Sequence, residues 1–129
     1  PDEMLTIDST TGKLTAITNP FGGIFLISNY GLNYFSSKLF AFQLSGIPEE
    51  ACIELLSNDY TNAGVKAYSV SGGPSYDNKL FKAPLDVATA VDTCSKAKTA
   101  ADSGYFMEID FYFDIDLNST YWSSQTWQN

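Results

Sequence analysis

The chain has 129 residues, enough for one domain, and a net charge of −8, which disfavours contact with nucleic-acid phosphates or anionic lipid. It has no histidine, so the usual general base, the Ser-His and Cys-His pairs and the commonest zinc ligand are excluded. Phosphate-loop, dinucleotide and nucleophile-elbow motifs are absent, as is any membrane-spanning apolar run. We predict a single domain over residues 1–129 that is not an enzyme and has no cofactor, metal or nucleic-acid partner.

The first third of the chain alternates turn signals with apolar runs. The apolar run Ile24–Ser28 has the length of a buried strand, and Lys38–Leu44 predicts a second strand. The strongest turn signal precedes the first of these strands and consists of Asn19, Pro20, Phe21, Gly22 and Gly23.

Each of the two cysteines lies in a segment that predicts a short helix with proline in its first turn, at residues 47–58 and 83–94. Cys52 shares a face with Leu55 and Leu56, and Cys94 shares one with Val87 and Val91. Both cysteines are therefore expected on the buried sides of their helices, and we predict a disulfide between them. It would stabilise the fold by about 4 kcal/mol in the chain-entropy model. The alternative is a pair of buried thiols that act as small hydrophobes.

The remaining segments predict more strands. Val65–Val70 predicts a third strand, and Lys79–Lys82 an edge strand that its lysines protect. The small residues 95–104 indicate a loop. Residues 105–117 are apolar at odd positions, which predicts one long, half-buried strand. Such alternation favours an antiparallel sheet with one solvated face. The expected fold class is therefore α+β, an antiparallel sheet packed with short helices.

Four carboxylates share one face of that long strand: Glu108, Asp110, Asp114 and Asp116. We interpret this acidic row as a solvated strand face, with a charged subunit contact or a calcium site as alternatives. A calcium site is disfavoured. The segment that starts at Asp114 begins like an EF-hand loop, but it has Ser119 where that loop needs glycine and Gln125 where it needs glutamate. A secreted carboxylate-dependent hydrolase would need two acidic residues converging in a pocket, which a flat row excludes.

Two further groups of residues are candidate contacts. Trp122 and Trp127 in the C-terminal tail favour a local core, with a binding patch as the alternative because tryptophan is enriched at interfaces. The exposed side of the second cysteine helix carries Asp86, Asp92 and Lys96. It could meet a neighbouring subunit, although an ordinary solvated helix face is favoured.

Three stretches, at residues 17–23, 47–55 and 83–94, occur in an order and spacing that resemble type IVb pilins. The resemblance implies a pilin head domain whose N-terminal, partly membrane-spanning helix lies outside these residues. In such a head the disulfide would attach the C-terminal region to the sheet.

By the same resemblance, the protein would be a structural subunit that polymerises with other pilin subunits into extracellular filaments for adhesion and aggregation. Its partners would be the pilus assembly machinery and a receptor on a host or bacterial surface. It would reside in the inner membrane and periplasm before assembly, touching the membrane only through the missing helix. The alternative within this class is a minor pilin or a type II secretion pseudopilin that initiates or tips the filament.

Overall fold

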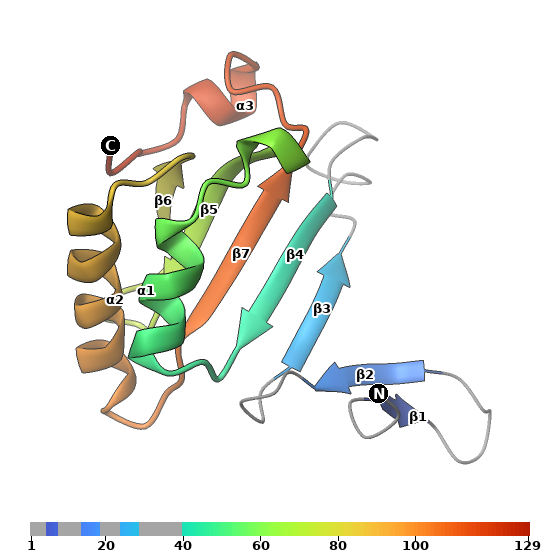
Figure 1. Cartoon of the computed structure of the whole chain (residues 1–129), viewed down its shortest axis with the longest axis vertical. Coiled ribbons are helices and arrows are strands. Elements are labelled where there is room, and N and C mark those ends of the chain that lie inside the picture. The colour runs from blue at the N-terminus through green and yellow to red at the C-terminus, as the bar shows by residue number, and fades with distance from the viewer. Residues whose placement is uncertain (1–4, 8–13, 19–23, 29–39) are drawn as a thin grey trace.

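The computed structural model describes the backbone of residues 5–7, 14–18, 24–28 and 40–129, and side chains from Ala41 onward. The turn predicted at Asn19–Gly23 lies outside the described residues. The described strands form one antiparallel sheet in the order β1-β2-β3-β4-β7-β5-β6 (Figure 1). Their bounds are β1 Leu5–Ile7, β2 Leu14–Thr18, β3 Ile24–Ser28, β4 Phe40–Ser45, β5 Val65–Ser71, β6 Lys79–Lys82 and β7 Glu108–Phe113.

The last strand, β7, lies between β4 and β5 and pairs with both in antiparallel register. The chain leaves the sheet after β4, forms helix α1 (Glu49–Ser57), and returns as β5 two positions further along, so that one position between β4 and β5 stays open. After β6 it forms helix α2 (Val87–Ala101) before β7 fills the position left open. Both helices lie on the same face of the sheet (Figure 1), so the central strand is covered by the two helices on that side.

The strands predicted at 24–28 and 79–82 are confirmed with their bounds, and those at 38–44 and 65–70 are confirmed with small shifts. The long strand predicted at 105–117 is wrong at both ends. Tyr105 and Phe106 are exposed before β7 begins. Asp114 has a φ of 55°, outside the β region, and this ends the strand.

Helix α2 is longer than predicted, and the loop expected at 95–104 is wrong as far as Ala101. Alanine and lysine are strong helix formers, and Asp86 caps the helix by accepting a hydrogen bond from the Thr89 backbone N–H at 2.7 Å. The buried face of α2 consists mostly of small side chains, so this helix can pack closely against the sheet. A Cβ placed on Gly72, just after β5, would lie 2.0 Å from the Ala97 carbonyl oxygen.

The face of α2 that was predicted to be buried is only partly correct. Cys94 is fully buried, but Val87 and Val91 are 61% and 43% exposed. The buried stripe instead runs along one side of the helix and consists of Ala90, Thr93, Cys94, Ala97, Ala100 and Ala101. The small side chains of this stripe let the helix backbone approach the sheet, whereas two valines there would hold it further away.

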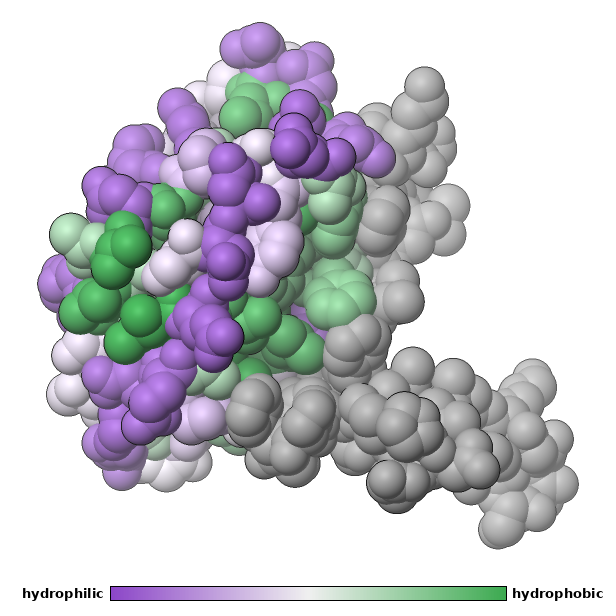
Figure 2. Space-filling model, viewed as in Figure 1, coloured by the Kyte–Doolittle hydropathy of each residue, from purple (hydrophilic) through white to green (hydrophobic). Residues whose placement is uncertain are grey.

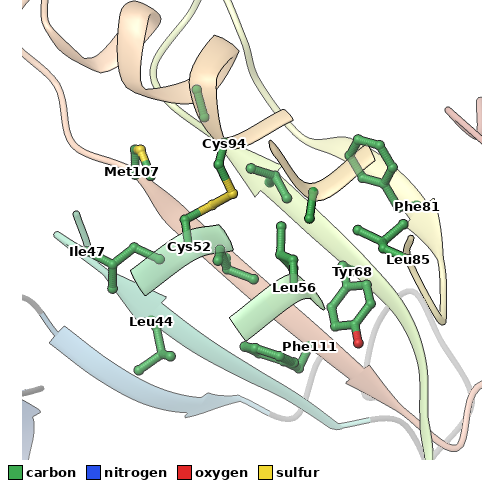
Figure 3. Close-up of a cluster of buried hydrophobic side chains, with 14 of the residues drawn as sticks. Leu44, Ile47, Cys52, Leu56, Tyr68, Phe81, Leu85, Cys94, Met107 and Phe111 are labelled. Atoms are coloured by element: carbon green, nitrogen blue, oxygen red, sulfur yellow. A yellow bond between two sulfur atoms is a disulfide. The ribbon is translucent and has the colours of Figure 1, made fainter. Parts of the chain in front are cut away.

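The predicted disulfide is confirmed: Cys52 of α1 and Cys94 of α2 are bonded, with their Cα atoms 5.9 Å apart (Figure 3). Both are fully buried in the main hydrophobic core, which the helices form with the sheet. In this core the Phe111 ring of β7 packs edge-on against Tyr68, with centroids 5.3 Å apart. None of the helices in the described part of the chain has the length and apolar character needed to cross a membrane.

Replacing both cysteines tests how much the disulfide contributes. The Cys52→Ala, Cys94→Ala double variant is expected to lose about 4 kcal/mol of unfolding free energy, because its unfolded chain gains the entropy of an open loop. Urea denaturation followed by circular dichroism measures this loss. Ser95→Ala, at an exposed neighbouring position on α2, is the matched control. Equal midpoints for wild type and the double variant would contradict the prediction.

A candidate binding pocket beneath the C-terminal tail

The face of the sheet that points away from α1 and α2 carries polar side chains in the register of three strands. Asp110 of β7 lies opposite Gln43 of β4 and Ser69 of β5. The odd residues of β7 pack into the core under the helices, and strand side chains alternate between faces. Gln43, Asp110 and Ser69 therefore form one row across the opposite face, with Glu108 and Tyr112 in the flanking rows.

The C-terminal tail folds over this same face. It forms the short helix α3 (Thr120–Ser123), whose Trp122 is buried in a second hydrophobic cluster with Ala67 and Ile115. The tail then pairs with edge strand β6: Trp127 forms a parallel bridge with Leu80, and the Gln128 N–H donates to the Leu80 carbonyl at 2.8 Å.

The side chain of Asn129 completes this attachment through the backbone of Lys82. It accepts from the N–H of Lys82 and donates to its carbonyl, at 2.7 and 2.8 Å. The edge strand β6, which the sequence predicted to be protected by its lysines, is therefore also covered by the tail.

A cavity of about 380 Å³, which we call the tail pocket, lies between the polar sheet face and the tail. The sheet supplies its carboxylates and the tail supplies much of its aromatic wall. Its lining residues are Gln43, Ser69, Asn78, Leu80, Glu108, Asp110, Tyr112, Tyr121, Trp122 and Gln125.

The interpretation of the acidic row as a solvated strand face is wrong for two of its four members. Asp110 is only 5% exposed and Glu108 is half-buried, and both line the tail pocket. Asp114 and Asp116 are exposed and lie beyond the end of β7. The row is split because the strand ends at Phe113 and the tail folds back over its first half.

Burial controls the ionisation of this pair. The pKa of Asp110 is raised from 3.8 to about 7, first by burial and then by the charge of Glu108, while a hydrogen bond from the Gln43 side chain opposes the shift. Burial also raises the pKa of Glu108. The Oδ1 atom of Asp110 is buried and has no hydrogen-bond partner among the described residues. The two salt bridges of the described residues both lie on α2 and involve neither carboxylate.

Two acidic residues thus converge in a pocket, which is the feature that a carboxylate-dependent hydrolase was expected to show. Their geometry nevertheless favours binding over bond cleavage. Glu108 and Asp110 project from the same face of one strand, two residues apart, so they approach a ligand from the same side. Glycosidase carboxylates flank the scissile bond instead. In addition, the described residues contain no group of three or more His, Cys, Asp or Glu side chains that could hold a metal ion.

The other predicted contact residues lie elsewhere. Asp86 caps α2, and Asp92 pairs with Lys96 at 2.8 Å on the exposed surface of that helix. These three residues are therefore on the opposite side of the sheet from Trp122 and Trp127, and the structure does not bring the two groups together. Trp127, half-buried, donates its indole N–H to the Trp122 carbonyl at 3.0 Å. A contact role for either group stays a prediction.

Sequence reasoning missed the polar residues that line the pocket together with the carboxylates, namely Gln43, Ser69 and Asn78. They come from three separate segments: the strand register places Gln43 and Ser69 opposite Asp110, and Asn78, just before β6, lines the same pocket. Tyr112 did carry a signal, because it is a non-acidic residue at an even position of the alternating segment.

A second hollow, of about 210 Å³, lies on the helix-covered face between α1 and the strands. Its lining is apolar and aromatic, consisting of Phe42, Leu44, Leu55, Tyr60, Ala63, Val65, Phe111 and Phe113.

Comparison with known proteins defines the fold. No protein-family model and no curated protein matches the sequence. Among solved structures, the chain is similar to the type IV b pilin from Salmonella typhi, with a TM-score of 0.54 and 19% sequence identity over 83% of this chain. The chain has a type IV pilin-like fold.

This pilin-like domain spans about two thirds of the matched pilin, since the alignment covers 66% of that chain. The resemblance stated from three short sequence stretches is therefore confirmed at the level of the fold. The pilin-like head consists of an antiparallel sheet, helices on one face and a single disulfide among the described residues.

The raised pKa of Asp110 predicts a pH-dependent stability. Between pH 3.8 and about 7 the unfolded chain releases this proton while the folded chain keeps it, so unfolding free energy falls as pH rises. Asp110→Asn is expected to remove most of this fall. The variant should match wild type near pH 4 and exceed its stability at pH 8 by on the order of 3 kcal/mol.

Urea denaturation at pH 4, 6 and 8 measures this difference. Glu54→Gln, at an exposed carboxylate on α1, removes the same charge outside the pocket and should follow the wild-type curve. Parallel curves for wild type and Asp110→Asn would show that Asp110 does not hold its proton in the folded state.

Proposed function

We propose that this pilin-like domain is the head of a structural subunit of a type IVb pilus. The subunit would polymerise with copies of itself into extracellular filaments for adhesion and aggregation. The observation that carries this proposal is the fold, which is similar to that of the type IV b pilin from Salmonella typhi.

The buried disulfide supports an extracellular setting, because such bonds form and persist in oxidising compartments. It also suits a filament subunit, for which slow unfolding matters more than turnover. In this proposal the subunit is held in the inner membrane before assembly and exposed on the cell surface afterwards.

The apolar hollow beside α1 supports assembly through an additional helix. A helix that packs under the sheet of a pilin head needs an apolar surface, and the hollow offers one built from Leu44, Leu55 and Phe113 among other residues. We propose that the N-terminal helix implied by the resemblance packs at this hollow.

The outer side of α2 is our candidate for lateral contacts between subunits. It combines the exposed Val87 and Val91 with the ion pair of Asp92 and Lys96. Figure 2 shows hydrophobic surface gathered over α1 and α2 on this face, with hydrophilic residues around it. An apolar centre with a charged rim is typical of protein interfaces.

A minor pilin or secretion pseudopilin would share this fold, so abundance in the filament distinguishes the two roles. In cells that carry the intact gene, filaments sheared from the surface are expected to contain this domain as their most abundant protein, measured by quantitative mass spectrometry. Deletion of the gene should abolish the filaments.

The control is re-expression of the intact gene in the deletion strain, which should restore filaments. A domain present at a few copies per filament would assign it to the minor class. A domain released as a monomer, with filaments unchanged in the deletion strain, would contradict the proposal.

A further inference from the structure

We propose that the tail pocket binds a small organic cation, whose ammonium group lies between the carboxylates of Glu108 and Asp110 and the aromatic wall of Tyr112 and Trp122. The argument uses the geometry of the pocket alone and does not depend on the role of the protein in a filament.

The first step is the unsatisfied carboxylate. Asp110 is 95% removed from solvent and lines the tail pocket, and its buried Oδ1 atom has no hydrogen-bond partner among the described residues. A buried carboxylate without a counter-charge is costly, so it takes up either a proton or a cation. Glu108, half-buried beside it, adds a second negative charge in the same cavity.

The second step is the aromatic wall. Trp122 packs against Tyr112 and Tyr121, with each pair of ring centroids 5.1 Å apart, and all three residues line the pocket. Indole and phenol rings attract a cation through their faces, most strongly where water is excluded. The tail already uses this interaction at its outer edge, where Lys82 Nζ lies 5.6 Å from the centroid of Trp127.

The third step is size and access. A cavity of about 380 Å³ is in the range of small-molecule sites. Asn78 and Tyr121 line the pocket and are exposed, so a ligand can enter from solvent. The side-chain amides of Gln43 and Gln125 offer hydrogen bonds to a polar group attached to the cation.

Charge selects against the other ligand classes. Two carboxylates and a net charge of −8 repel anions. Calcium takes six to eight oxygen ligands. The described residues contain no group of three or more His, Cys, Asp or Glu side chains that could hold a metal ion. A neutral sugar could stack on the rings, but it would bring no positive charge to Asp110 once this carboxyl is ionised.

Binding is expected to depend on pH, because protonated carboxyls hold a cation poorly. The titratable and polar groups facing Asp110 are Glu108 and Tyr112 from β7, Gln43 from β4, Ser69 from β5 and Tyr121 from the tail, with Asp77 acting on Glu108. Raising the pH from 5.5 to 8 passes the pKa of Asp110, about 7, and ionises this carboxyl, which should strengthen binding.

Choline is a suitable probe because its charge does not change with pH, and 3,3-dimethyl-1-butanol is its neutral counterpart of equal shape. With the wild-type chain at pH 8, we expect choline to change tryptophan fluorescence saturably. The neutral alcohol should bind at least tenfold more weakly. Asp110→Asn should weaken choline binding about tenfold, while Glu54→Gln, which removes an exposed charge on α1, should not.

The two probes test the proposal on wild-type protein, so the result stands even if the Asp110 variant does not fold. Equal binding of choline and the alcohol, or the absence of a saturable change, would overturn the proposal. Saturable binding of glucose or Ca²⁺ in place of choline would overturn it as well, by assigning the pocket to a neutral sugar or a metal ion.

Discussion

The bond between Cys52 and Cys94 is the constraint on which the arrangement of this domain depends. It joins two helices that are far apart in sequence and fixes both over the central strands β7 and β5. With α1 and α2 held together, the odd residues of β7 have a closed apolar core to enter. The even residues are then directed to the opposite face. The polar character of that face follows from the alternation of side chains along β7, and the pocket on it forms where the tail folds over the face.

The two faces of the sheet differ in the kind of side chain that they bury. The helix-covered face buries aliphatic and aromatic side chains, and its close helix packing relies on small residues such as Ala97 against Gly72. The opposite face retains a buried carboxylate at Asp110, which a core built only for stability would avoid. Trp122 and the pairing of the tail with β6 provide the cover that removes this carboxylate from water. The tail therefore both protects the sheet edge and creates the pocket.

The sequence supported the fold better than the site. Alternating apolar residues predicted β7, and proline with helical spacing predicted α1, because these patterns are local. The sequence also placed both cysteines on buried faces, although the true stripe of α2 avoids Val87 and Val91 because alanines allow closer approach to the sheet. The pocket was not predictable. Its residues come from β4, β5, β7, the tail, and β6 with the residue before it, and only the strand register and the return of the tail bring them together.

Carboxyl ¹³C NMR, recorded over pH 3 to 9 with Asp110 assigned through the Asp110→Asn variant, tests most directly whether this face carries a protonated, buried acid. The account predicts that Asp110 titrates with a midpoint near pH 7. It also predicts that choline lowers this midpoint, since a bound cation favours the ionised carboxylate. If the Asp110 carboxyl titrated near 4 and did not respond to choline, the carboxylate would be solvated and the tail pocket would not be a cation site.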